Sequence, residues 1–255
     1  MNGRFNLDGK IALVTGASGG LGRHFAGVLA AAGASVCVAA RRMEKVTETV
    51  AEIESSGGRA FGVEMDVTDV GSVAAAFGLI EEQVGPVTVV VNNAGIASGT
   101  LALDLEEIDW DQVMDTNLKG AWSVAQAAAQ RMAGADIGGV IVNIASVLGL
   151  GVSKGVLPYA VSKAGLIQMT KALALEWTMH GIRVNALAPG YVETDLTRDY
   201  LASEDGQKLV KRIPQRRPAE MAELDGPLLL LASDASSYMT GSVITVDGGH
   251  LVSSL

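Results

Sequence analysis

The sequence predicts an α/β fold, in which a parallel, doubly wound sheet of seven strands carries helices on both faces. Short runs rich in β-branched residues alternate along the chain with longer stretches whose apolar residues recur at helical spacing. The short runs are apolar on both faces, which is typical of strands in a parallel sheet that helices cover on either side. We expect strands at residues 11–15, 35–39, 61–63, 87–91, 140–144, 183–186 and 243–246, and helices at 21–32, 43–53, 70–84, 113–132 and 159–179.

The composition predicts one domain over residues 1–255. Hydrophobic residues make up 49% of the 255 residues and charged residues 18%, which is enough apolar material for one large core. No Pro/Ser-rich linker interrupts the pattern. The mostly polar stretch 193–218 breaks the alternation of strands and helices, and we interpret it as a helical lid over a substrate site. Long connections in compact domains are usually functional or disordered, and a plain surface excursion is the alternative.

Charge, cysteine and histidine usage exclude several classes of protein. The 19 basic and 28 acidic residues give a net charge of −9, so we expect neither a nucleic acid nor a membrane as partner. The single cysteine, Cys37, lies in an expected apolar strand and cannot form an internal disulfide. His24, His180 and His250 lie apart from other metal-ligand types, so no metal is expected. With neither a signal-peptide pattern nor an apolar run of about 18 residues, the chain is predicted to be cytoplasmic.

A glycine-rich turn follows the first expected strand and leads directly into the first expected helix. Residues 15–22 read Thr-Gly-Ala-Ser-Gly-Gly-Leu-Gly. Glycine permits a positive φ and a close backbone approach, so a pyrophosphate can rest against the amides at the helix N-terminus, where the helix dipole favours negative charge. Between a strand and a helix, this turn predicts a dinucleotide site, and a mere tight turn is the alternative.

The spacing of Gly16, Gly20 and Gly22 resembles the Thr-Gly-x-x-x-Gly-x-Gly motif of the short-chain dehydrogenase/reductase family. Further matches follow in the family's order, and together they are much more specific than any one of them. They are Asn92-Asn93-Ala94-Gly95, Asn117, Ser146, Tyr159 with Lys163, and Pro189-Gly190. The resemblance covers residues 7–249. It implies a Rossmann-type domain and the activity of a nicotinamide-dependent oxidoreductase.

Four of these residues are candidates for catalysis: Asn117, Ser146, Tyr159 and Lys163. Tyr159 and Lys163 share one face of an expected helix, and Ser146 follows a central strand at its carboxyl end, where open α/β sheets bind ligands. Hydride transfer at a carbinol carbon requires a proton to move at its oxygen. A free phenol titrates near about 10, and an ammonium about 4 Å away is worth about 4 kcal/mol, the size needed to bring that pKa towards neutrality. We expect Lys163 to supply this ammonium.

The family resemblance assigns a role to each residue. It implies that Tyr159 is the acid and base, that Ser146 hydrogen-bonds the substrate oxygen, and that Lys163 binds the ribose of the nicotinamide half. Asn117 would hold a water that relays protons to the lysine. The implied cofactor contacts are Gly16, Ser18, Gly20 and Leu21 near the phosphates, Asp66 near the adenine, Asn93 behind the adenosine ribose, Thr194 at the nicotinamide amide, and in addition Gly22, Val67, Ala94, Gly95, Pro189 and Gly190. Asp66 has a second interpretation, as a cap of the next helix.

The end of the second expected strand predicts a preference for NADP(H), with NAD(H) as the weaker alternative. An NAD enzyme places an acidic residue there to bind the adenosine 2′-hydroxyl, but this chain has Ala40 followed by Arg41 and Arg42. Guanidinium groups bind phosphate strongly, so both arginines are candidates for the 2′-phosphate, with a solvated helix start as the alternative. NADP-preferring relatives often carry a second basic residue where this chain has Gly19, so we expect a moderate preference.

The expected reaction interconverts a ketone and a secondary alcohol of a free small molecule. The chain resembles both 3-oxoacyl-carrier-protein reductases and sugar-acid dehydrogenases of the gluconate type. Carrier-protein reductases tend to place an arginine where this chain has Leu175, and an acidic carrier would meet a net charge of −9. We therefore favour the free substrate and keep the carrier-linked 3-oxoacyl substrate as the alternative.

Two further classes of protein stay open. A non-catalytic protein that senses the dinucleotide would keep the fold without turnover, but Ser146, Tyr159 and Lys163 are all present. Epimerases and dehydratases of sugar nucleotides usually have an added substrate domain, for which few residues remain after Lys211. The resemblance also implies a homotetramer with 222 symmetry, built from the apolar surface of the last strand and the two longest helices.

Overall fold

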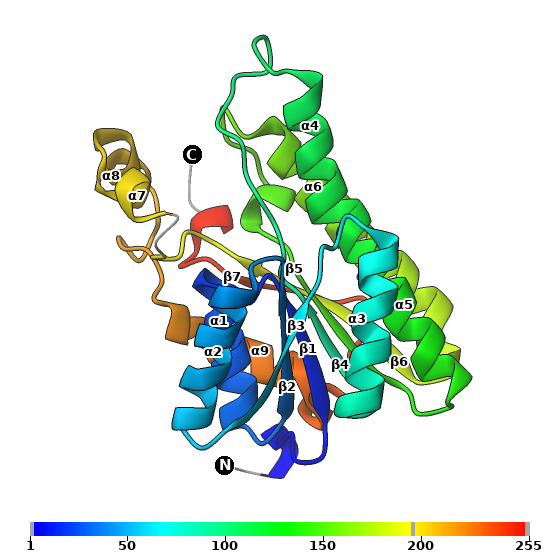
Figure 1. Ribbon diagram of the computed structural model, residues 1–255. Helices are drawn as coiled ribbons and strands as arrows, with labels where there is room; N and C mark the ends of the chain where they lie inside the picture. Colours follow the sequence, from blue (N-terminus) through cyan, green and yellow to red (C-terminus); the bar gives the residue numbers. More distant parts are fainter. Residues whose placement is uncertain (1–2, 195–196, 253–255) are drawn as a thin grey trace.

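A parallel sheet of seven strands organises the protein, as the computed structural model shows for residues 3–194 and 197–252 (Figure 1). The strand order is β3-β2-β1-β4-β5-β6-β7, and every neighbouring pair is parallel. The order reverses between β1 and β4, and open α/β sheets bind their ligands outside the carboxyl ends of strands at such a point. The strands are β1 (Ile11–Thr15), β2 (Ser35–Ala40), β3 (Arg59–Glu64), β4 (Val89–Asn92), β5 (Gly139–Ile144), β6 (Ile182–Pro189) and β7 (Val243–Val246).

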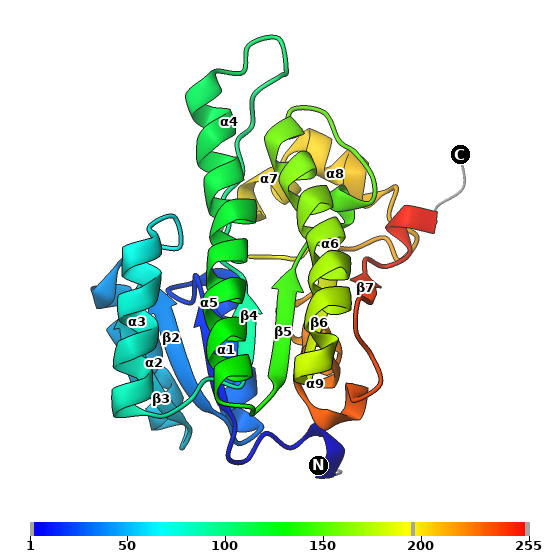
Figure 2. The same ribbon diagram turned by 90° about the vertical axis from the view of Figure 1, so that its right-hand side faces the viewer.

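Helices cover both faces of the sheet (Figure 2). Helices α1, α2 and α9 lie on one face, and α3, α5 and α6 lie on the other. The buried side chains divide in the same way, since Phe25 and Leu228 belong to one core cluster and Phe77 and Val124 to another. This arrangement confirms the predicted doubly wound fold. The helices are α1 (Gly20–Ala31), α2 (Met43–Ser55), α3 (Val70–Gln83), α4 (Glu107–Met114), α5 (Gly120–Gly134), α6 (Leu157–Trp177), α7 (Arg198–Ala202), α8 (Glu204–Val210) and α9 (Asp225–Ala232).

The alternation of side chains along β1 and β2 builds the two cores. Leu13 and Cys37 belong to the cluster that includes α3 and α5, whereas Val14 and Val38 belong to the cluster that includes α1 and α9. Burial raises the pKa of Cys37 to about 12, so its thiol stays protonated. A buried thiol of this kind fills the core, which agrees with the expectation from the sequence.

Two helical segments differ from the predictions. The helix expected at 113–132 begins earlier, as α4, and a π-helical segment η2 (Asp115–Lys119) joins α4 to α5. The acidic residues Glu107, Asp109 and Asp111 weaken the apolar period of α4, so its first turns were missed. Helix α9 was missed altogether, because its run of consecutive leucines at 228–231 shows no helical period.

The expected lid at 193–218 contains the two short helices α7 and α8, and its role as a lid stays a prediction. Both lie at the end of the sheet where the strands have their carboxyl ends (Figure 1). Residues 195–196 of the expected lid, and residues 1–2 and 253–255 of the expected domain, lie outside the described residues. In the part of the chain that the structure describes, no helix is long and apolar enough to cross a membrane.

Candidate active site

The turn between β1 and α1 requires glycine at the predicted positions. Gly16 and Gly20 have φ values of 64° and 52°, in the left-handed region that other residues rarely adopt. A Cβ on Gly16 would lie 2.8 Å from the Cα of Ala94, and a Cβ on Gly22 would meet the Gly16 carbonyl. Because Gly19 at the N-cap of α1 has no side chain, the first amides of the helix stay available for an anion.

The segment after β4 braces this turn with hydrogen bonds. The Asn93 side-chain amide donates to the carbonyls of Thr15, at 2.9 Å, and Gly16, at 3.4 Å. The Thr15 hydroxyl accepts from the backbone N–H groups of Asn93 and Ala94, each at 3.1 Å. Asn93 therefore acts on the cofactor site through the backbone of the glycine turn. Its expected place behind the adenosine ribose stays a prediction.

Asp66 lies after β3 and is not the cap of the next helix. The cap of α3 is Asp69, whose side chain accepts hydrogen bonds from two amides of the first turn. Asp66 instead accepts from the amide and hydroxyl of Thr68, at 3.0 and 2.7 Å. Burial acts to raise the pKa of Asp66, but these two bonds and the nearby Arg41 guanidinium outweigh it and lower the pKa. Asp66 and Arg41 thus lie near each other, while Val67 is buried.

Arg41 and Arg42 are exposed between β2 and α2. Arg42 is the N-cap residue of α2 and its side chain makes no cap hydrogen bond. Farther along the helix, Lys45 is paired with Glu48 at 2.7 Å. Among the described residues, no ion pair is found for Arg41 or Arg42. Two guanidinium groups are therefore available beside the adenine end of the expected site.

Lys163 and Tyr159 lie on one face of α6, as predicted. Lys163 is only 4% exposed, and its Nζ donates to the carbonyl of Ile144 at 2.7 Å. The same Nζ lies 5.5 Å from the centroid of the Tyr159 ring. Burial lowers the pKa of Lys163 to about 8. The ammonium is therefore held at the carboxyl end of β5, and it can lose its proton just above neutral pH.

Ser146 hydrogen-bonds the catalytic tyrosine candidate. Burial raises the pKa of Tyr159 above its usual value of 10, and the hydrogen bond with Ser146 lowers it by less. The Ser146 hydroxyl also accepts from the amide of Leu148 at 3.1 Å, which fixes its position. This result differs from the expectation that Lys163 lowers the pKa of the tyrosine. Burial lowers the pKa of the lysine itself to about 8, and its Nζ is bound to the Ile144 carbonyl.

Asn117 joins the catalytic helix to the segment after β4. It lies in the π-helical segment η2, a type of distortion that is frequent at functional sites. Its Oδ1 accepts from the Ile96 amide at 2.8 Å, and its Nδ2 donates to the Ile96 carbonyl at 2.8 Å and to the Ser162 hydroxyl at 3.1 Å. Ser162 in turn donates to the Tyr159 carbonyl at 2.8 Å. Both amide hydrogens of Asn117 are thus used, and its expected water stays a prediction.

The segment after β6 holds the last predicted contacts. A Cβ on Gly190 would lie 2.8 Å from the Cα of Asp247, so this backbone approach requires glycine next to Pro189. Thr194 is 9% exposed, and its hydroxyl lies 3.1 Å from that of Thr197. Its expected contact with the nicotinamide amide stays a prediction.

The structure brings the predicted residues to one end of the sheet. The segments after β1, β2, β3, β4, β5 and β6 contribute most of them, and α6 and η2 contribute the rest. Sequence reasoning missed two residues of this region, Ser162 and Tyr191. Ser162 lies inside the motif of Tyr159 and Lys163, and Tyr191 directly follows Pro189-Gly190, but a motif does not show which further side chains take part. The described residues contain no group of three or more His, Cys, Asp or Glu side chains placed to hold a metal ion.

Comparison with known proteins identifies the family. A family model described as enoyl-(acyl carrier protein) reductase matches residues 16–250. The chain belongs to the short-chain dehydrogenase/reductase family. It is 38% identical to 2-dehydro-3-deoxy-D-gluconate 5-dehydrogenase of Escherichia coli (strain K12), over 97% of each chain. It is also 39% identical to the 3-oxoacyl-[acyl-carrier-protein] reductase FabG of Staphylococcus aureus (strain N315), over 94% of this chain and 97% of that one.

Solved structures of the short-chain dehydrogenase/reductase family share the fold. A gluconate 5-dehydrogenase from Burkholderia cenocepacia J2315, in complex with NADP and tartrate, is 36% identical with a TM-score of 0.95 over 98% of each chain. A short-chain type dehydrogenase/reductase from Mycobacterium marinum is 40% identical with a TM-score of 0.92 over 97% of each chain. The predicted family, Rossmann-type fold and oxidoreductase class are thereby confirmed.

Proposed function

We propose that this short-chain dehydrogenase/reductase uses NADP(H) to interconvert a ketone and a secondary alcohol of a free small molecule. One observation carries the proposal: Ser146 and Tyr159 are hydrogen-bonded to each other at the carboxyl end of β5, with the Lys163 Nζ 5.5 Å from the tyrosine ring. The glycine turn supports a dinucleotide here, because its backbone approaches leave no room for a Cβ at Gly16 or Gly22.

In this mechanism, side chains of the protein donate and accept the proton that moves at the substrate oxygen. A nicotinamide cofactor, held by the glycine turn after β1 and by Lys163, would provide the hydride chemistry. Tyr159 donates its proton to the substrate oxygen during ketone reduction and takes it back during alcohol oxidation. Because burial raises the pKa of Tyr159, the phenol is protonated at neutral pH and ready for reduction. Ser146 orients the same oxygen, and Lys163 supplies a cation whose pKa of about 8 lets it exchange protons.

Arg41 and Arg42 support the choice of NADP(H). They follow Ala40, where an NAD enzyme has a carboxylate, and Arg41 lies near Asp66 at the expected adenine end. A relative of known structure, the gluconate 5-dehydrogenase of Burkholderia cenocepacia, was crystallised with NADP. A cytoplasmic location fits this cofactor and the free thiol of Cys37.

The substrate is proposed to be free, although carrier-linked substrates give the second candidate. Relatives of both kinds match at nearly the same identity, 38% for the gluconate-type enzyme and 39% for the reductase FabG. Leu175, which is 81% exposed, presents an apolar side chain where carrier-protein reductases tend to have an arginine. This absence of a cation, with the net charge of −9, disfavours an acidic carrier.

The test is a panel of free ketones, free alcohols and a 3-oxoacyl thioester, each assayed with NADPH or NADP⁺ and with NADH or NAD⁺. We expect turnover of free ketones with NADPH. The variant Tyr159→Phe should lose about 10²- to 10⁴-fold in single-turnover hydride transfer, with nucleotide affinity unchanged, because only the proton donor is removed. A variant within tenfold of the parent would show that another group is the acid. Turnover restricted to the thioester would favour the second candidate.

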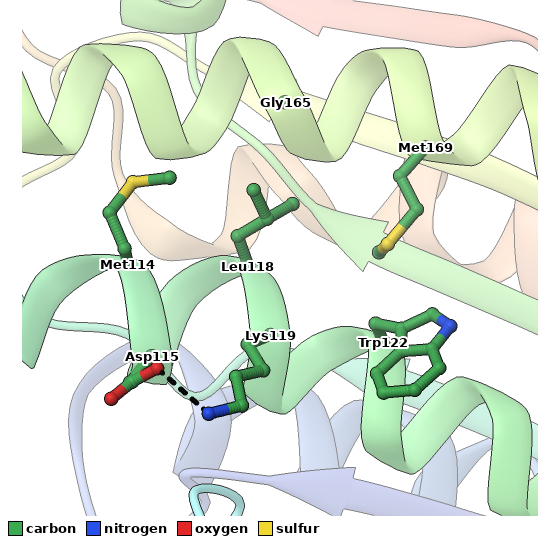
Figure 3. Close-up of a pocket in the computed structure, with 7 residues that line it drawn as sticks. All are labelled: Met114, Asp115, Leu118, Lys119, Trp122, Gly165 and Met169. Atoms are coloured by element: carbon green, nitrogen blue, oxygen red, sulfur yellow. Dashed lines mark hydrogen bonds and ion pairs between the residues drawn. The ribbon is translucent and has the colours of Figure 1, made fainter. Parts of the chain in front are cut away.

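We also propose that the protein forms a homotetramer with 222 symmetry. An apolar groove of about 480 Å³ lies between the helices α4–η2–α5 and α6 (Figure 3). Met114, Leu118 and Trp122 line one side together with the ion pair of Asp115 and Lys119, and Gly165 and Met169 line the other. Strand β7, at one edge of the sheet, is only partly buried. Sedimentation at micromolar concentration tests the assembly, and a single species of 26.3 kDa would contradict it.

A further inference from the structure

A second tyrosine, Tyr191, lies at the same end of the sheet as the catalytic tyrosine candidate. It follows Gly190 directly at the end of β6. Its ring stacks on Tyr200, with centroids 6.4 Å apart and planes at 30°, and contacts His250, with centroids 5.8 Å apart and planes at 47°. Aromatic contacts on two sides restrict how the Tyr191 ring can move.

The contacts of Tyr191 come from segments that are far apart in the sequence. Ser153, in the loop before α6, hydrogen-bonds the Tyr191 hydroxyl. His250 lies in the short 3-10 helix η7 (His250–Val252), at the same end of the sheet as α7 and α8 (Figure 1). Asp247 anchors that turn, since its two carboxylate oxygens accept from the amides of Gly249 and Leu251, each at 2.8 Å. Three segments thus position Tyr191: Ser153 bonds its hydroxyl, and Tyr200 and His250 contact its ring.

Tyr191 follows the carboxyl end of β6, which pairs with the end of β5 that leads to Ser146. Burial raises the pKa of Tyr191, and so do the neighbouring phenols of Tyr200 and Tyr159, whereas Ser153 and Arg212 lower it by less. The effect of the Tyr159 phenol on this pKa agrees with a position of both tyrosines at the same end of the sheet. Tyr191 therefore remains a neutral hydroxyl at neutral pH, able to donate one hydrogen bond and to accept others.

We propose that the Tyr191 hydroxyl, held by Ser153, binds a second oxygen of the substrate close to the reacting carbinol. The preferred substrates are then diols and hydroxyketones rather than simple ketones or alcohols. A site built to hydrogen-bond a hydroxyl discriminates against an analogue without it, because the analogue leaves a desolvated polar group unpaired. This inference rests on the proposed ketone/alcohol activity and specifies its substrate class.

Three ketones that differ in one hydroxyl test the proposal: 2-butanone, 3-hydroxy-2-butanone and 4-hydroxy-2-butanone, each reduced with NADPH. Tyr191→Phe keeps the stacked ring and removes only the hydroxyl. We expect kcat/KM to fall about tenfold for at least one hydroxyketone and less than twofold for 2-butanone. Ser153→Ala should act in the same direction with a smaller effect. Tyr238→Phe is the matched control, because this tyrosine is fully exposed on the surface.

The outcomes separate this inference from the proposed function. An equal loss on all three ketones would show that Tyr191 only supports the fold of the site, and an unchanged Tyr191→Phe would show that its hydroxyl binds no substrate. A parent protein that reduces 2-butanone as well as both hydroxyketones would overturn the inference and leave the proposed function standing. A parent protein that reduces no ketone or thioester of either panel would overturn both.

Discussion

The glycine turn after β1 and the segment after β6 both leave the carboxyl end of the same sheet, but different kinds of contact hold them. The glycine turn is fixed by two close approaches that exclude a Cβ and by bonds between side chains and backbone, in which the Asn93 side-chain amide donates to the Thr15 carbonyl and the Asn93 N–H donates to the Thr15 hydroxyl. The segment after β6 also pairs through its backbone, since Val192 bridges to Ala219, but it adds aromatic side-chain contacts of Tyr191 with Tyr200 and His250.

This difference indicates which part of the site tolerates substitutions and which part does not. Backbone contacts depend on glycine at a few positions and are suited to a ligand part that never changes, such as a pyrophosphate. Side-chain contacts can be exchanged one at a time without moving the backbone. We therefore expect changes in the glycine turn to abolish nucleotide binding, and changes after β6 to alter substrate choice.

The largest expected effect tests the glycine turn with two alanine substitutions in one helix. In Gly22→Ala the added Cβ would meet the Gly16 carbonyl and the Asn93 amide, whereas in Gly27→Ala it would meet nothing within 4 Å. We expect Gly22→Ala to weaken NADPH binding by at least about 100-fold, and Gly27→Ala to keep the affinity and add about 0.5–1 kcal/mol of stability. Calorimetric titration and thermal unfolding measure both. Equal NADPH affinities of the two variants would show that a Cβ at position 22 does not disturb the cofactor site.

The buried Lys163 predicts how stability depends on pH. Its pKa falls from 10.5 in the unfolded chain to about 8 in the folded protein. Between these values the unfolded state binds more protons, so stability rises with pH, by about 3 kcal/mol across the window. Below pH 8 Lys163 is protonated in both the folded and the unfolded state. The folded protein then bears the full free-energy cost of burying this charge.

Denaturant unfolding at pH 7.5 and 9.5 tests this effect. The parent protein should gain stability relative to Lys163→Met as the pH rises, because the methionine variant has no group to titrate at this position. Parallel curves for the two proteins would mean that the pKa of the lysine is not lowered by burial.

A smaller effect is expected for cofactor choice at the end of β2. In the double variant, Ala40→Asp supplies a carboxylate for the ribose 2′-hydroxyl. Arg41→Ser removes a guanidinium that would bind the 2′-phosphate. We expect the ratio of kcat/KM for NADPH and NADH to change by about 10- to 100-fold and to reverse. Lys45→Ser is the control, because it removes a cation of α2 that is already paired with Glu48. A parent protein that is faster with NADH would show that Arg41 is only a surface charge.

The smallest expected effect concerns the aromatic side chains that contact Tyr191 after β6. In His250→Ala the ring that contacts Tyr191 is lost, while the backbone of the glycine turn is untouched. We expect KM for the ketone to rise about two- to fivefold, corresponding to one weak aromatic contact, with unchanged NADPH affinity. A parallel loss of NADPH affinity would show that the two parts of the site are not independent.

Local pattern was sufficient to predict much of this protein. The expected strands at 11–15 and 243–246 coincide with β1 and β7, because β-branched runs bounded by polar or glycine residues mark a strand without reference to distant contacts. The Tyr159 and Lys163 pair could be predicted for the same reason, since residues four apart share a helix face. Helix α9 could not, because a helix that is apolar on all sides has no period to detect.

Other features were decided only by the tertiary structure. The sequence contains Lys163, but only the packing of α6 against β5 buries the lysine and places it on the Ile144 carbonyl, which lowers its pKa. In the same way, the sequence contains Tyr191 without a role, and three distant segments give it one by converging on its hydroxyl and ring. Residue type and spacing determine which groups are present. Burial and contacts between distant segments set the pKa values and the orientations of these groups. Both burial and such contacts depend on the whole fold.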